Sequence, residues 1–231
     1  MTKNHLKRIS SPRTWILDRK STTFTVRPNA GGHSFENGLP LGIVIRDMLG
    51  LAKSMTEVKK ILNNNEILVD GKRRKDHRFI VGLFDVLKFS LLNKSYRLTF
   101  DKKGRIVLIE IDDKESNTKV CKIVGKSLVK KGKIQYHLHD GKSILSEVQA
   151  KVGDTLLISL PTLEIKSSLP FQEGVTIFLT KGRYAGDVGQ LESVRGDEVI
   201  YIRDGKKIET SKNYAFVVGK EKAEIKIKDD N

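Results

Sequence analysis

The sequence predicts an α+β protein of several small modules in which β structure predominates. Helical periodicity is confined to residues 40–63, whereas from residue 67 onward β-branched and aromatic runs alternate with Gly-containing turns. The 231 residues include 43 Lys and Arg against 28 Asp and Glu, which gives a formal net charge of +15. Because such a surplus attracts polyanions, the expected partner is nucleic acid or an anionic membrane.

The amino-acid composition helps to decide between these two kinds of partner. No run of residues approaches the roughly 18 uncharged apolar residues that span a bilayer, and no apolar signal region follows the first residues, so we expect a cytoplasmic protein with no membrane partner. Cys121 is the only cysteine. An internal disulfide and a zinc site with two or more cysteines are therefore excluded.

Residues 1–36 are rich in Lys, Arg, Ser, Thr and Gly, and we expect a basic arm that orders only on a partner. Its cations can neutralise phosphates, and Trp15 can stack on a base. Packing of Trp15 against the protein's own core is the alternative. The arm residues expected to contact RNA are Lys3, His5, Lys7, Arg8, Arg13 and Trp15.

The segment 37–100 is predicted to form a small helix-plus-sheet module. Its first helix begins with Pro40 and ends at Gly50, an asymmetry typical of helices. Ser54 and Glu57 have the spacing of a capping box, which predicts a second helix to about residue 63.

A strand at residues 67–69 is predicted to enter a tight turn at Asp70 and Gly71. The turn is followed by a dense basic tip that includes Arg78. The β-rich segments 79–89 and 96–100 are expected to close this module.

Residues 101–168 are predicted to form a central, all-β domain. Its β-branched runs, separated by Gly turns, span residues 105–111, 120–124, 134–139 and 155–160. Seven lysines form a basic cluster there, for which RNA contact and mere solubilisation stay equally open. They are Lys119, Lys122, Lys126, Lys130, Lys131, Lys133 and Lys142.

The shorter strand spacing in residues 169–218 predicts a small five-stranded barrel. Its strands are expected at residues 175–180, 188–194, 198–203, 206–210 and 214–218. The segment 219–231 mixes lysines and acids, and we expect it to be a disordered charged tail.

A glycine-rich segment at residues 181–189 places three glycines around Lys181, Arg183 and Tyr184. Its backbone could approach phosphates while Tyr184 stacks on a base, although any small barrel also needs glycine at tight corners. The segment resembles the KOW motif of ribosomal proteins and transcription elongation factors. That resemblance implies an SH3-like barrel in which Lys181, Arg183 and Tyr184 contact RNA.

Residues 40–89 resemble the RNA-binding domain named after small-subunit ribosomal protein four, which also occurs in pseudouridine synthases and some tRNA synthetases. The family pattern has two short helices, a strand, an Asn-Gly or Asp-Gly turn and a basic loop. The resemblance implies an RNA face comprising Arg46, Ser54, Lys59, Lys60, Lys72, Arg73, Arg74, Lys75 and Arg78.

The segment from His5 to Trp15 resembles the signature of the archaeal and eukaryotic small-subunit ribosomal protein four-e family, whose members have this order of arm, helical module, central β domain and barrel. The resemblance implies a structural constituent of the small ribosomal subunit. Its partners would be small-subunit rRNA and neighbouring ribosomal proteins, and it would be monomeric within the ribosome.

Residues with catalytic potential form no recognisable constellation in this sequence. His137 and His139 precede Asp140 and could suggest a metal site, but surface or core histidines are the favoured interpretation. Cys121 lies in no nucleophile motif, and no phosphate loop or dinucleotide fingerprint occurs. We therefore expect no enzyme activity, no cofactor and no metal. The alternatives are an RNA-modifying enzyme resembling pseudouridine synthases and a KOW-type transcription elongation factor.

Overall fold

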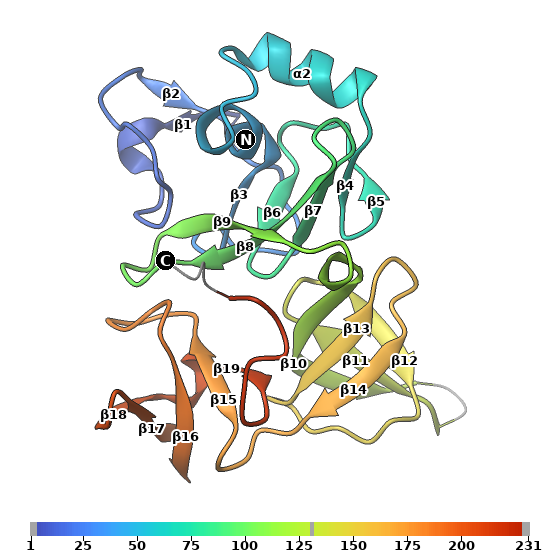
Figure 1. The fold of residues 1–231 in the computed structure, drawn as a ribbon, viewed down its shortest axis with the longest axis vertical. Helices are drawn as coiled ribbons and strands as arrows, with labels where there is room; N and C mark the ends of the chain where they lie inside the picture. Colours follow the sequence, from blue (N-terminus) through green and yellow to red (C-terminus); the bar gives the residue numbers. More distant parts are fainter. Residues whose placement is uncertain (1–3, 130–131, 228–231) are drawn as a thin grey trace. The chain divides into compact units, whose positions relative to one another are not determined.

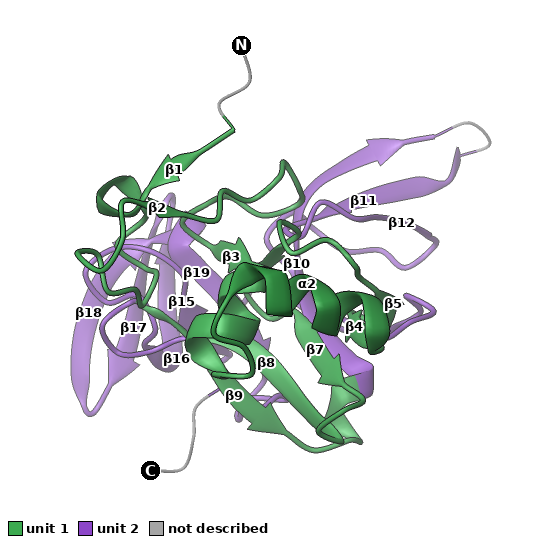
Figure 2. Cartoon of the chain, turned by 90° about the horizontal axis from the view of Figure 1, so that it is seen from above, with its two compact units in different colours: residues 1–99, 105–116 green, residues 100–104, 117–231 purple. Residues whose placement is uncertain are grey.

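The computed structural model describes residues 4–129 and 132–227. Strands predominate among these residues and helices are few (Figure 1), so the predicted mostly-β, α+β class is confirmed. The chain divides into two compact units (Figure 2), the first made of residues 1–99 and 105–116 and the second of residues 100–104 and 117–231. No helix among the described residues is long and apolar enough to cross a membrane.

The N-terminal arm is folded within the first unit. Strands β1 (Leu6–Lys7) and β2 (Phe24–Thr25) pair antiparallel, and a 3-10 turn, η1 (Arg8–Ser10), follows β1. The side chain of Trp15 is only 2% exposed. The expectation of an arm that orders only on a partner therefore disagrees with the structure, and the alternative, in which Trp15 packs inside the protein, is found.

Both predicted helices are present. The first begins as α1 (Leu41–Ile43) and continues as a π-helical turn, η2 (Val44–Met48). The second, α2 (Met55–Asn64), starts with the predicted capping box: the Ser54 hydroxyl accepts from the Glu57 amide at 3.3 Å, and the Glu57 carboxylate accepts from the Lys53 amide at 2.8 Å. The hydrogen bond from the Lys53 amide favours the charged carboxylate and is the main reason why the pKa of Glu57 is lowered.

A five-stranded sheet with the order β5-β4-β7-β8-β9 lies beside these helices. Its strands are β4 (Ile67–Val69), β5 (Lys72–Arg73), β7 (Val86–Phe89), β8 (Lys94–Phe100) and β9 (Ile106–Ile111). Asp70 and Gly71 have φ values of 50° and 73°, so the predicted tight turn is of the primed type. The strand β9 was expected in the central domain but pairs here, because its backbone continues the edge left by β8.

Two shorter strands, β3 (Gly38–Pro40) and β6 (Ile80–Gly82), pair antiparallel next to this sheet. A 3-10 turn, η3 (Glu115–Asn117), connects the first unit to the second.

The central sheet has the order β12-β11-β10-β13-β14. Its strands are β10 (Thr118–Leu128), β11 (Ile134–Leu138), β12 (Ser143–Ser146), β13 (Thr155–Ser159) and β14 (Ile165–Leu169). The predicted strands at residues 120–124, 134–139 and 155–160 are confirmed. The strands β12 and β14 were missed because their serines and lysine dilute the β-branched signal.

The C-terminal sheet contains all five predicted strands, in the order β18-β17-β16-β15-β19. They are β15 (Thr176–Leu179), β16 (Val188–Arg195), β17 (Glu198–Arg203), β18 (Lys206–Ser211) and β19 (Ala215–Gly219), with a 3-10 turn, η5 (Lys212–Tyr214), before the last. A core cluster that includes Ile177, Leu191 and Tyr201 fills one side of the sheet. Within the described ranges β18 and β19 are its two edges and do not pair with each other.

The segment after β19 is ordered through residue 227. The Thr176 hydroxyl donates to the Glu221 carbonyl at 2.9 Å, and Ile225 and Ile227 are buried. The expectation of a disordered tail is therefore wrong for residues 219–227, because two isoleucines give it apolar surface to bury. Residues 228–231 lie outside the described part of the chain.

Candidate nucleic-acid interface

The arm presents some of the predicted RNA-contacting side chains to solvent. His5, Lys7 and Arg13 are exposed, and the His5 ring meets the Phe24 ring edge-on with 5.4 Å between centroids. An open hollow beside them is lined by Lys7, Ile9, Arg19, Lys20, Ser21, Thr22 and Thr23. Lys3, which was also predicted to contact RNA, lies outside the described residues.

Two arm arginines instead hold the arm together. Arg8 is 6% exposed, and its Nη1 donates to the Asp18 carbonyl at 2.7 Å. Arg19 donates from Nη1 to the Ser11 carbonyl at 2.8 Å and from Nη2 to the Pro12 carbonyl at 2.7 Å. The structure therefore gives Arg8, which the sequence placed on RNA, a role in shaping the arm.

Trp15 also makes its hydrogen bonds within the protein. Its Nε1–H donates to the carbonyls of Phe35, at 3.0 Å, and Gly38, at 2.9 Å. Since the ring is buried and its only donor is used, the indole cannot stack on a base in this conformation. The prediction of a stacking Trp15 does not agree with the structure.

The exposed cations of the helix-plus-sheet module gather around α2 and β5. Both Figure 1 and Figure 2 show α2 beside β4 and β5. Arg73 joins these elements, because its Nη2 donates to the Asn63 carbonyl at the end of α2 at 3.0 Å. Ser54 caps α2 and uses its hydroxyl there. The exposed cations on this face, which we call the α2–β5 face, are Lys53, Lys59, Lys60, Lys72, Arg73 and Lys75.

Three other predicted cations of the module, which are half-buried, contact other groups of the protein. Arg46 makes a two-pronged contact with its neighbour Asp47, with both N···O distances 2.8 Å. The Arg74 guanidinium lies 4.2 Å from the centroid of the Phe79 ring. Arg78 donates from Nε to the Arg27 carbonyl at 2.9 Å. Because each of these guanidinium groups contacts another group of the protein, we regard the three arginines as stabilising the module more than as binding phosphates.

The glycine-rich loop between β15 and β16 keeps its two cations at the surface. Lys181 and Arg183 are exposed, and the Arg183 guanidinium lies 5.8 Å from the centroid of the Tyr184 ring. Tyr184 itself packs partly against the C-terminal core, so only part of its ring is available. Gly186 has φ +86°, and a Cβ there would lie 1.9 Å from the Asp101 carbonyl oxygen, so this glycine serves a tight corner.

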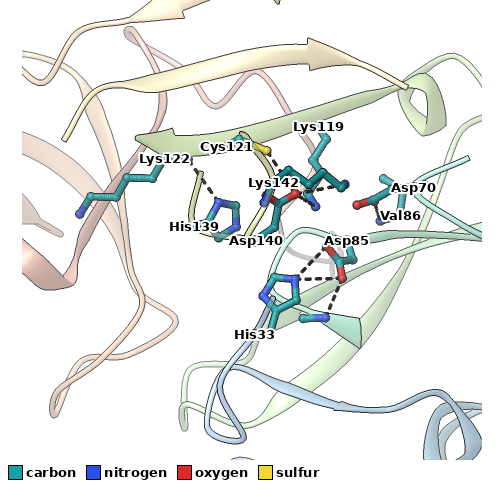
Figure 3. Close-up of polar contacts among 11 residues, drawn as sticks. His33, Asp70, Asp85, Val86, Lys119, Cys121, Lys122, His139, Asp140 and Lys142 are labelled. Atoms are coloured by element: carbon teal, nitrogen blue, oxygen red, sulfur yellow. Dashed lines mark hydrogen bonds and ion pairs between the residues drawn. The ribbon is translucent and has the colours of Figure 1, made fainter. Parts of the chain in front are cut away.

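The lysine cluster of the central domain is divided between interior and surface. Lys119 is fully buried and its Nζ lies 2.8 Å from Asp140 Oδ2, while Lys142 Nζ lies 3.1 Å from the same atom (Figure 3). Burial alone would raise the pKa of Asp140, but the charges of Lys119 and Lys142 outweigh it and hold that pKa well below its ordinary value. Sequence reasoning had no local signal for this pairing.

Of the other lysines in this cluster, Lys126 and Lys133 are exposed. Lys122 is half-buried, and burial together with the charge of Lys212 lowers its pKa to about 8. Lys130 and Lys131 lie outside the described residues.

The two strand histidines bond to different partners. The His137 ring lies between the hydroxyls of Ser127, at 3.1 Å, and Ser143, at 2.9 Å. The His139 Nδ1 accepts from the Lys122 amide at 3.3 Å (Figure 3). These contacts are those of histidines that stabilise a sheet.

Comparison with known proteins identifies the family. The chain is 39% identical over 236 residues to small ribosomal subunit protein eS4 of Methanosphaera stadtmanae, covering 100% of this chain and 98% of that protein. It is 41% identical over 240 residues to the protein of the same name from Methanocaldococcus jannaschii, covering 97% of this chain and 98% of that protein. The chain belongs to ribosomal family S4e.

Further matches agree with membership of the S4e family. The model of ribosomal family S4e matches residues 92–165, and the model of the RS4NT (NUC023) domain matches residues 2–36. The crystal structure of 30S ribosomal protein S4e from Thermoplasma acidophilum superposes with a TM-score of 0.70 at 27% identity, covering 79% of this chain and 95% of that one. The family resemblance drawn from His5 to Trp15 is confirmed.

Proposed function

We propose that this S4e-family chain is a structural constituent of the small ribosomal subunit that binds and stabilises small-subunit rRNA in the cytoplasm. The observation that carries the proposal is similarity along the whole chain to relatives named small ribosomal subunit protein eS4. The net charge of +15 supports it, because neutralising phosphates supplies most of the affinity of such proteins for RNA.

The mechanism we propose is phosphate neutralisation by exposed cations on rigid supports. The α2–β5 face displays its cations on, or within two residues of, a helix and a strand that Arg73 links. Arg74 and Arg8 stabilise the surfaces from beneath, through Phe79 and the Asp18 carbonyl. Several modules on one chain bind more tightly than any of them alone, because each bound module raises the local concentration of the others.

The C-terminal sheet and its glycine-rich loop are proposed to be an SH3-like KOW module that adds RNA contacts through Lys181 and Arg183. Five antiparallel strands in the order β18-β17-β16-β15-β19, with the loop between β15 and β16, support this. The chain is proposed to have no catalytic activity and to lie as a monomer beside neighbouring ribosomal proteins. An RNA-modifying enzyme and an elongation factor are less favoured, since the relatives matched over the full chain carry a ribosomal name.

Filter binding of the purified protein to a small-subunit rRNA fragment across a salt series tests the proposal. If about six to ten phosphates are contacted, log affinity should fall against log salt with a slope of roughly −4 to −9. The protein should also sediment with small subunits and leave them only at high salt. A slope near −1, or equal binding to unrelated RNA of the same length, would contradict the proposal.

A further inference from the structure

A second cationic site lies inside the second unit, around Lys122 of β10. The Lys122 Nζ donates to the Ala215 carbonyl at 2.6 Å and to the Asn213 carbonyl at 3.4 Å. Figure 3 shows this side chain extended away from His139. Among the residues that the structure describes, no carboxylate forms an ion pair with Lys122. A half-buried ammonium is thus held by backbone dipoles alone.

The charged neighbour of this ammonium is another cation. Lys212 of η5 directly precedes Asn213, whose carbonyl accepts from Lys122, and its positive charge contributes to the lowered pKa of Lys122. The Lys212 Nζ itself lies 5.4 Å from the centroid of the Phe171 ring. Within the described ranges Lys212 has no carboxylate partner either. Two lysines therefore share one region without a compensating charge, an arrangement that disfavours the charged form of the more enclosed one.

The glycine-rich loop reaches the same short segment, 213–215. The Thr180 hydroxyl donates to the Tyr214 carbonyl at 3.0 Å, and a Cβ on Gly182 would lie 3.3 Å from the Tyr214 ring. Lys181 and Arg183 flank Gly182 in the chain. The segment 213–215 therefore accepts from Lys122 of β10, directly follows Lys212 of η5, and is contacted by the loop that carries Lys181 and Arg183.

We propose that Lys122 and Lys212 together bind one phosphate group of the rRNA backbone. A phosphate between them supplies the missing negative charge, and its oxygens accept from both ammonium groups. The exposed Lys181 and Arg183 would attract the adjoining phosphates, which favours a polyanion over a single acidic side chain of a neighbouring protein. This assignment rests on the proposed function and extends it to a site outside the α2–β5 face.

The first test is filter binding of the full-length protein to small-subunit rRNA across a salt series. The double variant K122M/K212M should bind more weakly, with a slope shallower by about one unit. Its matched control is K166M, which removes an exposed lysine of β14 in the same unit and should bind as wild type does. The variant K122R/K212R keeps both charges and should restore most of the slope.

The outcomes separate this inference from the proposed function. A steep slope in the wild type that is unchanged in K122M/K212M overturns the phosphate site, leaves the ribosomal function standing, and points to an acidic residue of a neighbouring protein. A shallow slope in the wild type overturns both.

The second test needs no variant and so does not depend on how the variants fold. NMR of the full-length protein with ¹³C-labelled lysine follows the titration of Lys122, whose pKa in the free protein is about 8. Saturation with the rRNA fragment should raise that pKa, since a phosphate favours the charged ammonium. Inorganic phosphate is the parallel probe. A rise with phosphate but none with rRNA would refute the rRNA assignment, and a pKa unmoved by either would refute the site.

Discussion

Replacing Trp15 tests whether the arm folds without RNA. Truncation in Trp15→Ala removes a fully buried ring, which typically costs about 3–5 kcal/mol of unfolding free energy. Trp15→Phe keeps most of the ring but leaves the Phe35 and Gly38 carbonyls without their shared donor. That loss should cost about 1–3 kcal/mol. The matched control is Phe24→Ala, since this arm aromatic is 53% exposed and should change stability by less than about 0.5 kcal/mol.

Urea unfolding followed by circular dichroism, without RNA, measures these three free energies. The wild type offers a second reading, because Trp15 is the only tryptophan and its fluorescence reports on the arm alone. Its emission in the RNA-free protein should be blue-shifted and weakly quenched by acrylamide. Emission typical of water-exposed tryptophan, or a Trp15→Ala variant no less stable than Phe24→Ala, would refute the packed arm.

Three further predictions concern the basic tip, the buried ion pair and the C-terminal segment. Joint replacement by alanine of Lys72, Arg73 and Lys75 should weaken rRNA binding with little loss of stability in urea, because the bond that it removes, from Arg73 to the Asn63 carbonyl, is exposed to solvent. Arg74→Ala should lower stability by about 0.5–1 kcal/mol because it removes the contact with Phe79. Asp140→Asn should cost about 3–5 kcal/mol at pH 7 because it removes the carboxylate that pairs with the buried Lys119. Because the pKa of Asp140 is lowered in the folded protein, the stability that its carboxylate contributes should be complete above the unfolded pKa of about 3.9 and should decrease as the pH falls below that value. Urea titration of the wild type and of Asp140→Asn at pH 7 and pH 3 measures this, and an equal loss of stability at both pH values would contradict the pairing. Deleting the residues after Gly219 should lower the melting temperature of the C-terminal sheet, because the Thr176 hydroxyl loses the carbonyls of Lys220 and Glu221 as acceptors. An unchanged melting temperature would show that this segment contributes nothing to stability.

Local patterns were sufficient for most secondary-structure elements. The capping box at Ser54, the primed turn at Asp70 and the five C-terminal strands all depend on residues close in sequence. Their physical causes, a side chain that satisfies a free amide or a residue that tolerates positive φ, act within a few residues. The same is true of the family, whose signature lies within the first fifteen residues.

The sequence by itself determined that this protein is basic, mostly β, and a member of a ribosomal family. Only the tertiary structure decided which cations are displayed and which are used internally. Nothing in the sequence pattern distinguishes Arg8 from Lys72. In the structure, however, Arg8 is buried and donates to the Asp18 carbonyl, whereas Lys72 is exposed on β5. Lys119 is buried with its ammonium paired to Asp140, a residue 21 positions away that the fold brings to it. The physical reason is that the cost of burying a charge depends on partners supplied by distant strands, and no local pattern records them.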